Sequence, residues 1–338
     1  MLSRPPRFSG TVQDVRTRLD QRLDAYAQIL RGATGLVLTR PVIDRKAWAA
    51  YHASLEIPKR FPGVQTFLWV PVIPPGGAAK FEREQRRLGH PDYRVWTRDD
   101  VTPVTAIAFV EPFVRENVKA LGFDMYSEPV RREAMARARD SGDMAITGKV
   151  SLVIVVRPLP GSIMYVPVYR DGGVPATIES RRERLLGYVS SAFRIEDLLS
   201  ATLGNRLLDF HVRVFDGPVA KDDWSMYDSA PSGTRAADGA ALFRHVISFP
   251  VGGRPWAVEL TSTPTYDGRG AVDHSAMVAV AGVLLSVLGA WVVALALSLR
   301  GRTRALSHLT TTLQANQQDL ERANVAMTEA RDAALAAV

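Results

Sequence analysis

The sequence predicts an α+β fold in which one long stalk helix carries two tandem subdomains, followed by one transmembrane helix and a parallel coiled coil. Three observations carry this prediction. Apolar residues recur at helical spacing near the N-terminus, short β-rich segments bounded by Pro and Gly fill the middle, and an uncharged apolar run lies near the C-terminus. With 338 residues, the chain is long enough for more than one domain.

The first expected element is a stalk helix within residues 1–40. Its apolar positions follow one another mostly at spacings of three and four: Val12, Val15, Leu19, Leu23, Tyr26, Ile29 and Leu30. Pro41 closes this pattern. A second helix is predicted over Asp44–Leu55, with Asp44 as its N-cap because a carboxylate there accepts hydrogen bonds from free backbone N–H groups.

Residues 41–170 and 171–270 are expected to form two α+β subdomains on antiparallel sheets. In the first, we expect helices at 78–88, 115–122 and 129–141, with strands at 61–73, 93–97, 102–110, 144–147, 150–156 and 162–169. The helix at 129–141 is closed by Gly142. In the second, we expect a helix at 195–203, with strands at 186–193, 211–216, 224–227, 242–250 and 254–260.

Residues 275–299 predict a transmembrane helix. This run of 25 residues has no charge and would span roughly 37 Å, more than the ~30 Å hydrocarbon core of a bilayer. A buried helix of a soluble domain is the alternative, but it leaves the RGRTR that follows unexplained. Arg300, Arg302 and Arg304 place residues 300–338 in the cytoplasm and residues 1–274 outside. Because the N-terminus has no apolar signal segment, we expect a further transmembrane helix upstream.

The segment after the apolar run predicts a coiled coil. Residues of an a/d seam alternate at spacings of three and four: Leu306, Leu309, Leu313, Asn316, Leu320, Ala323, Met327, Ala330, Ala334 and Ala337. A parallel homodimer is the favoured arrangement, and a single amphipathic helix along the bilayer is the alternative. The tail carries no catalytic motif, so we expect any output module beyond Val338.

Composition excludes several other classes of protein. The 42 Lys+Arg and 35 Asp+Glu are spread along the chain, whereas a nucleic-acid-binding protein concentrates its basic residues in a stripe. The absence of Cys excludes disulfides and Cys-based zinc sites. The six His are scattered, so neither a metal site nor any cofactor is expected.

The middle of the chain resembles the CHASE domain, the extracytoplasmic sensor of cytokinin receptors and of many bacterial histidine kinases and diguanylate cyclases. The resemblance runs from about Val12 to Phe215. The matching pieces are Glu111-Pro112, Asn117, Leu121-Gly122-Phe123-Asp124, Arg132, Ala138-Arg139, Gly142, Thr147, Leu152 and Pro167-Val168-Tyr169, with Phe61-Pro62-Gly63 upstream and Gly187-Tyr188-Val189 downstream. It implies that 41–170 is a membrane-distal PAS-like subdomain that binds the ligand, and that 171–270 is a membrane-proximal PAS-like one.

The resemblance also implies four ligand-site positions. An acidic residue of the plant receptors corresponds to Arg131 here, Thr147 matches a pocket threonine, and Val153 and Tyr165 replace a pocket leucine and a later threonine. Because Arg131 inverts the charge, purine cytokinins are not expected, and a small organic anion is the hypothesis, since guanidinium binds carboxylate or phosphate with two hydrogen bonds. The alternative is that Arg131 is a solvated helix residue.

Together these features predict the ligand-sensing and transmembrane part of a dimeric receptor in a bacterial inner membrane, most simply a sensor histidine kinase without its catalytic core. A diguanylate cyclase output is the alternative within the same class. A membrane-anchored periplasmic enzyme and a purely structural anchor are alternatives from other classes. The enzyme lacks recognisable catalytic groups, and the anchor would not need the pocket motif.

Overall fold

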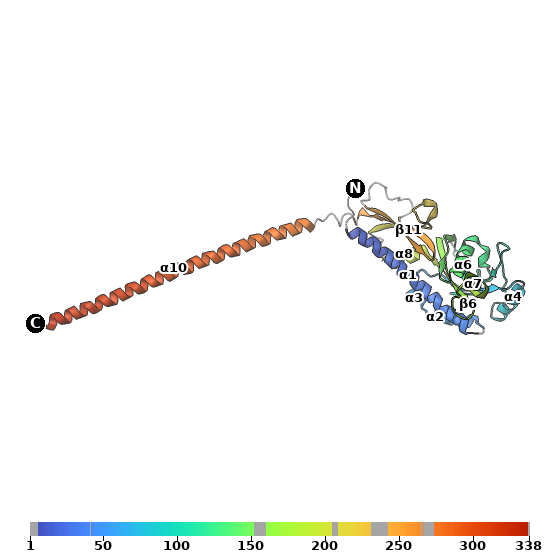
Figure 1. Cartoon of the computed structure of the whole chain (residues 1–338), viewed down its shortest axis with the longest axis horizontal. Helices are drawn as coiled ribbons and strands as arrows, with labels where there is room; N and C mark the ends of the chain where they lie inside the picture. Colours follow the sequence, from blue (N-terminus) through green and yellow to red (C-terminus); the bar gives the residue numbers. More distant parts are fainter. Residues whose placement is uncertain are drawn as a thin grey trace. The chain divides into compact units, whose positions relative to one another are not determined.

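The computed structural model describes residues 6–40, 42–151, 160–204, 209–230, 243–264, 266 and 274–336. The chain divides into two compact units, Met1–Arg269 and Gly270–Val338 (Figure 1). The first unit contains two antiparallel sheets and their covering helices, and the second is a single helix. This is the mixed helix-and-sheet composition that the sequence predicts.

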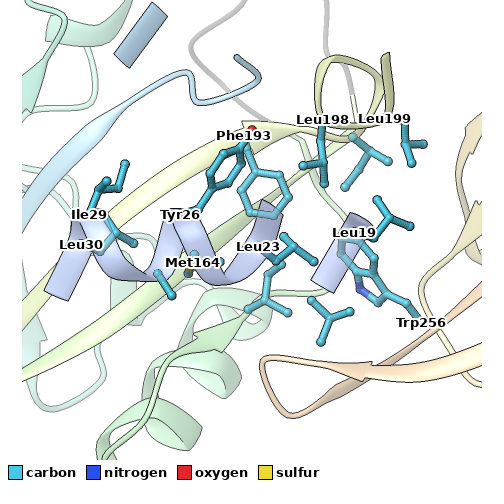
Figure 2. Close-up of a cluster of buried hydrophobic side chains, with 14 of the residues drawn as sticks. Leu19, Leu23, Tyr26, Ile29, Leu30, Met164, Phe193, Leu198, Leu199 and Trp256 are labelled. Carbon is cyan, nitrogen blue, oxygen red and sulfur yellow. The ribbon is translucent and has the colours of Figure 1, made fainter. Parts of the chain in front are cut away.

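The first helix, α1 (Pro6–Thr39), lies against the rest of its unit along most of its length. One stripe of its side chains is buried: Val12, Val15, Leu19, Leu23, Tyr26, Ala27, Ile29, Leu30 and Ala33. The stripe confirms the helix and apolar positions that the sequence predicts. In Figure 2 its residues pack against Met164, Phe193, Leu198 and Trp256, which come from both sheets and the segment between them. The stalk is therefore part of the core of the first unit.

The first sheet has seven strands in the order β2-β1-β7-β6-β4, with β3 paired to β1 and β5 paired to β6. Its strands are β1 (Phe67–Ile73), β2 (Val104–Thr105), β3 (Phe109–Glu111), β4 (Ala145–Ile146), β5 (Val150–Ser151), β6 (Pro160–Tyr169) and β7 (Leu185–Arg194). The sequence assigns the β7 segment to the second β-rich region. The structure places it in the centre of this sheet, because β7 pairs with both β1 and β6.

Alternate residues of these strands face two different hydrophobic cores. Phe67, Trp69, Met164, Val166 and Val189 belong to the core that contains α1. Leu68, Val70, Ile163, Tyr165 and Ala192 belong to a second core that contains residues of α6 (Pro129–Ser141). The register between β6 and β7 places two residues of the second core, Ile163 and Ala192, opposite each other, and it places Tyr165 opposite Ser190.

The helices around this sheet are mostly short. They are α2 (Arg45–Ser54), α3 (Ile57–Arg60), α4 (Ala78–Arg87), α5 (Arg115–Val118), η1 (Met125–Ser127), α6 and α7 (Ile178–Arg184). The predicted caps are confirmed. Asp44 accepts a hydrogen bond from the backbone N–H of Ala47 at 2.7 Å, and Gly142 ends α6 with a left-handed φ of 77°. The strand expected at 93–97 is only a single bridge between Trp96 and Phe123.

The second sheet has four antiparallel strands in the order β10-β11-β8-β9. They are β8 (Phe210–Phe215), β9 (Ser225–Asp228), β10 (Arg244–Val251) and β11 (Arg254–Ser262). Helix α8 (Ile195–Leu203) leads from β7 toward this sheet, and η3 (Asp222–Trp224) precedes β9. The buried apolar residues of this second sheet belong to the same core as α1, so α1 packs on both sheets.

The second unit is helix α10 (His274–Ala336), 63 residues long. Its segment Val278–Arg300 has a mean hydropathy of 2.5, none of it is buried within the chain, and its length and composition suffice to cross a membrane. One apolar helix is thus confirmed close to the predicted 275–299. The heptad seam from Leu306 to Ala334 lies on the same continuous helix, and Ala337 lies outside the described residues. The pairing of this seam with a second chain stays a prediction.

Candidate functional site

A cavity of about 90 Å³ lies against the first sheet, on the side that faces α6. Its walls come from β1, β6, β7, the N-terminal end of α6 and the two segments around Trp96 and Phe123. The lining residues are Thr66, Leu68, Trp96, Arg98, Ile107, Lys119, Ala120, Phe123, Met125, Arg131, Ile163 and Ala192. An apolar enclosure with a few polar groups is the usual character of a small-molecule site.

Arg131 of the predicted ligand site lies in this cavity wall. It occupies the first turn of α6, and its side chain is only 7% exposed. The alternative that Arg131 is a solvated helix residue is therefore wrong. The reason is tertiary: the first turn of α6 packs against Phe123, whose ring centroid lies 5.3 Å from the guanidinium carbon.

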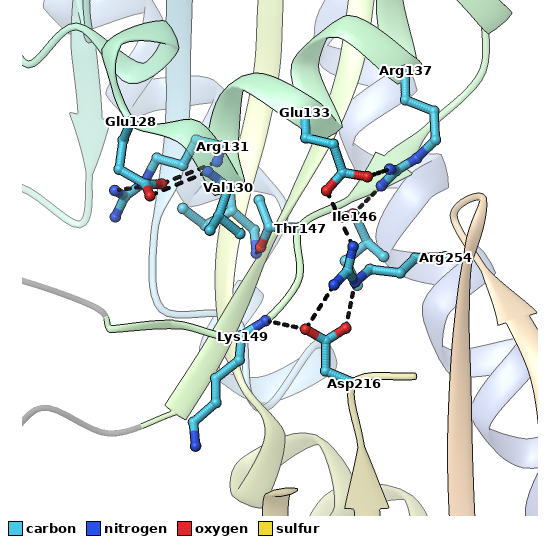
Figure 3. Close-up of polar contacts among 11 residues, drawn as sticks. Glu128, Val130, Arg131, Glu133, Arg137, Ile146, Thr147, Lys149, Asp216 and Arg254 are labelled. Atoms are coloured by element: carbon cyan, nitrogen blue, oxygen red, sulfur yellow. Dashed lines mark hydrogen bonds and ion pairs between the residues drawn. The ribbon is translucent and has the colours of Figure 1, made fainter. Parts of the chain in front are cut away.

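The N-cap of α6 holds Arg131 in place (Figure 3). Glu128 caps the helix by accepting hydrogen bonds from the backbone N–H groups of Val130 at 3.2 Å and Arg131 at 3.0 Å. The same carboxylate accepts a third hydrogen bond from Arg131 Nη1 at 3.3 Å. Arg131 Nε is buried and has no hydrogen-bond partner among the described residues. The guanidinium thus keeps donors that a bound molecule can use.

Thr147 supports the cavity without lining it. Its Oγ1 accepts a hydrogen bond from the backbone N–H of Ile163 at 2.9 Å, and its own N–H donates to the Ile163 carbonyl at 2.9 Å. Both contacts fix the backbone of a residue that does line the cavity. Thr147 is itself fully buried. The structure therefore places Thr147 one layer behind the cavity wall.

Tyr165 lies on the same face of β6 as Ile163 but outside the cavity lining. Its ring packs edge-on against Tyr188 with 5.9 Å between centroids, and its hydroxyl has no partner among the described residues. Burial raises the pKa of this hydroxyl well above its ordinary value, although Arg131 opposes the shift. Ser190, directly opposite on β7, also has a buried hydroxyl without a described partner. Val153, the fourth predicted position, lies outside the described residues.

Sequence reasoning missed two cations of this cavity, Arg98 and Lys119. Both are exposed, and they lie on irregular or short elements where no periodicity marks a buried face. Phe123 offered the one usable clue, because it belongs to the Leu121–Asp124 motif. The ring of Phe123 contacts one predicted and one missed residue of the site. The guanidinium carbon of Arg131 lies 5.3 Å from its centroid, and that of Arg98 lies 5.9 Å away.

A second, more open pocket of about 500 Å³ shares one wall with the first, formed by Trp96. Its lining includes His90, whose ring packs against Tyr93, Phe109 and Phe113. Burial, together with the charge of Arg45, lowers the pKa of His90 below its ordinary value. Among the described residues, no three His, Asp or Glu side chains gather in a cluster that could bind a metal.

Polar contacts link α6 to the second sheet (Figure 3). Arg254 of β11 donates to Glu133 of α6 at 3.1 Å and to Asp216 Oδ2 at 2.9 Å, with a further short contact between its Nε and Asp216 Oδ1. Asp216 also accepts a hydrogen bond from the backbone N–H of Lys149 at 3.0 Å. We call Glu133, Lys149, Asp216 and Arg254 the junction cluster. It connects the helix that bears Arg131 with the sheet that follows it in the chain.

A family model described as the CHASE domain matches residues 41–227, more than half of the chain. Probable histidine kinase 6 of Oryza sativa subsp. japonica is 32% identical over 146 residues, which cover 41% of this chain and 14% of the relative. Hybrid signal transduction histidine kinase A of Dictyostelium discoideum is 26% identical over 205 residues, which cover 54% of this chain and 9% of the relative. The matched region is thus a small part of both relatives.

Two solved structures are also similar. The periplasmic sensory domain of the Campylobacter jejuni chemoreceptor Tlp1 has a TM-score of 0.46 and 11% identity, and the match covers 75% of this chain and 93% of that one. A methyl-accepting chemotaxis protein X has a TM-score of 0.41 and 16% identity, with coverage of 75% and 98%.

Proposed function

Because the chain belongs to the CHASE domain family, we propose that it is the ligand-sensing and membrane-spanning part of a receptor whose ligand binds in the cavity that Arg131 lines. The carrying observation is the buried guanidinium. A side chain with this charge is 7% exposed beside a cavity and keeps an unused donor. An acceptor bound in the cavity would take up a donor of this guanidinium in a charge-assisted hydrogen bond.

The ligand is a small organic anion in this proposal. Three cationic side chains line the cavity, namely Arg98, Lys119 and Arg131, and no acidic residue is among its described lining. The cavity therefore has an excess of positive charge. Guanidinium groups favour carboxylate or phosphate over neutral ligands, because each hydrogen bond to an anion is charge-assisted.

The architecture supports an assignment of the two sheets to two PAS-like subdomains. In this proposal, the first sheet belongs to the ligand-binding membrane-distal subdomain, expected at 41–170, and the second sheet to the membrane-proximal subdomain, expected at 171–270. Strand β7 completes the first sheet from the second segment. The junction cluster supplies a direct contact between the two, so displacement of α6 on ligand binding would reach β11.

The membrane-spanning and signalling parts follow the same proposal. Val278–Arg300 crosses a bacterial inner membrane, with residues 1–274 in the periplasm and 300–338 in the cytoplasm as a parallel dimeric coiled coil. Ligand binding shifts a two-state equilibrium of this dimer. A histidine-kinase output is favoured because both curated relatives are histidine kinases and the matched region is a small part of each.

A binding experiment on the whole chain tests the proposal. The chain in detergent micelles would be screened by thermal shift against organic acids, amino acids and nucleobases, since a ligand that binds the folded state raises Tm by mass action. Arg131→Gln should abolish the shift given by the best binder. Arg132→Gln is the matched control, because Arg132 is the next residue of α6 and lies outside the cavity lining. Equal loss in both variants, or in neither, contradicts the site.

A further inference from the structure

The three cations of the cavity are not equivalent. Arg131 is buried and forms an ion pair with Glu128 at 3.3 Å, so its charge is already balanced. Arg98 and Lys119 are exposed, and neither side chain makes a hydrogen bond or ion pair with any described residue. The unbalanced positive charge of the cavity therefore lies at its solvent-exposed side.

The acidic residues near these two cations do not change this balance. Asp99 and Asp100 follow Arg98 in the chain, and Glu116 lies one turn before Lys119. In the described part of the chain, none of these carboxylates pairs with Arg98 or Lys119, and none lines the cavity. A ligand anion can therefore contact both cations without displacing an existing partner.

The exposed side of the cavity favours an anion, whereas the inner end, beside Arg131, favours a neutral oxygen. An anion beside Arg131 would also approach the Glu128 carboxylate, which already accepts three hydrogen bonds from the first turn of α6. Repulsion between two carboxylates that share one guanidinium cancels much of the attraction. A neutral oxygen avoids this repulsion and still accepts a hydrogen bond from the Arg131 guanidinium, whose one side-chain hydrogen bond to a described residue runs from Nη1 to Glu128.

The size of the cavity limits the part of the ligand between these two ends. An engineered cavity of about 150 Å³ binds benzene, which has six heavy atoms, so one of about 90 Å³ encloses roughly four heavy atoms. The walls around this part are apolar, with Leu68, Ile107, Phe123 and Met125 among them. A short aliphatic body suits this space.

On the basis of the proposed function, we propose that the ligand is a short carboxylate that carries a second, neutral oxygen and binds in one orientation. Its carbonyl or hydroxyl oxygen accepts hydrogen bonds from Arg131 at the inner end. Its aliphatic body lies against Phe123 and Met125. Its carboxylate remains at the exposed side, between Arg98 and Lys119. The latter two residues then determine the preference for an anion, and Arg131 determines the preference for the second oxygen.

The test compares three molecules that differ by one group. 4-Oxopentanoate has both features, 4-oxopentanamide lacks the charge, and pentanoate lacks the inner oxygen. Affinities would be measured by isothermal titration of the full chain in detergent micelles, alongside the double variant Arg98→Gln/Lys119→Gln. Arg94→Gln/Arg115→Gln is the matched control, because it removes the same charge from exposed residues outside the cavity lining.

We expect 4-oxopentanoate to bind at least ten-fold more tightly than either other molecule. The Arg98/Lys119 double variant should lose at least ten-fold for 4-oxopentanoate and less than three-fold for the amide, whereas the control should retain wild-type affinity. Arg131→Gln should reduce the preference for 4-oxopentanoate over pentanoate to near unity.

Equal affinity for the acid and the amide, or no binding of 4-oxopentanoate at 10 mM, overturns this inference. Wild-type affinity in the Arg98/Lys119 variant together with lost affinity in Arg131→Gln also overturns it, but keeps the proposed sensing site. Binding that is insensitive to both changes places the ligand elsewhere and rejects the proposed site itself.

Discussion

Tyr165 and Tyr188 provide a matched pair for testing whether the polar groups behind the cavity lack partners. Both side chains are fully buried, they lie on neighbouring strands, and their rings contact each other at 5.9 Å. They differ in one respect. The Tyr188 hydroxyl donates a hydrogen bond to the Met135 carbonyl at 3.0 Å, whereas the Tyr165 hydroxyl has no partner among the described residues.

The same substitution should therefore have opposite effects at the two positions. A buried polar group without a partner costs about 1–3 kcal/mol, and a satisfied hydrogen bond contributes about 1 kcal/mol. Tyr165→Phe should raise the free energy of unfolding of the ligand-free protein by about 1–2 kcal/mol, a rise in Tm of roughly 2–6 °C. Tyr188→Phe should lower Tm by roughly 2–4 °C, because it leaves the Met135 carbonyl with one hydrogen bond fewer.

The assay is thermal unfolding of the full chain in detergent, followed by near-UV circular dichroism at pH 7 without ligand. Burial raises the pKa of both tyrosines, so both are neutral at this pH and ionisation does not enter the comparison. Equal destabilisation by the two variants would refute the reasoning, since it would mean that the Tyr165 hydroxyl is satisfied.

Three further outcomes follow from other contacts. Arg254→Met removes the hydrogen bonds to Asp216, whose side chain is 12% exposed. Tm should therefore fall by roughly 4–8 °C (about 2 kcal/mol). In a double-mutant cycle, adding Asp216→Asn to this variant should lower Tm no further. Gly122→Ala should prevent stable folding, because its Cβ would lie 1.7 Å from a backbone oxygen, whereas Gly76→Ala, with a similar positive φ and open space, should cost less than about 2 kcal/mol. A hydrogen bond from Arg182 of α7 holds the pKa of Asp140 below its usual range. The contribution of Asp140 to stability is therefore present above about pH 4 and is lost on acidification. Asp140→Asn should reduce the difference in Tm between pH 6 and pH 3, and an unchanged difference would contradict this.

Local patterns in the sequence predicted the elements whose burial depends on near neighbours. The buried stripe of α1, the N-cap at Asp44 and the end of α6 at Gly142 all depend on residues within one or two turns. The family was indicated by matching pieces spread from about Val12 to Phe215, Leu121–Asp124 among them. The apolar run near the C-terminus can be recognised without any partner in the chain, because its length and composition alone suffice to cross a membrane.

The candidate site depended on contacts that no local pattern contains. Arg131 looks like a solvated residue in a helix rich in arginine, and only the packing of its turn against Phe123 shows that it is buried. Arg98 and Lys119 meet at one cavity although they are 21 residues apart and lie outside any long helix or strand. Their side chains converge because the Trp96 segment bridges to Phe123, a pairing between distant segments.

By itself, the sequence determined the stalk helix, the apolar helix near the C-terminus and the α+β composition, since each depends on spacing within a short window. It also indicated the family, through motifs whose order is spread along the chain. Only the tertiary structure decided that β7 closes the first sheet and that Thr147 and Tyr165 lie behind the cavity rather than in it. It also decided that, among the described residues, Arg131 has an ion-pair partner while Arg98 and Lys119 have none. The physical reason is that burial and pairing of a charged side chain depend on which distant segment packs against it. A period of two or 3.6 residues specifies the face that is buried, but it does not specify the partner.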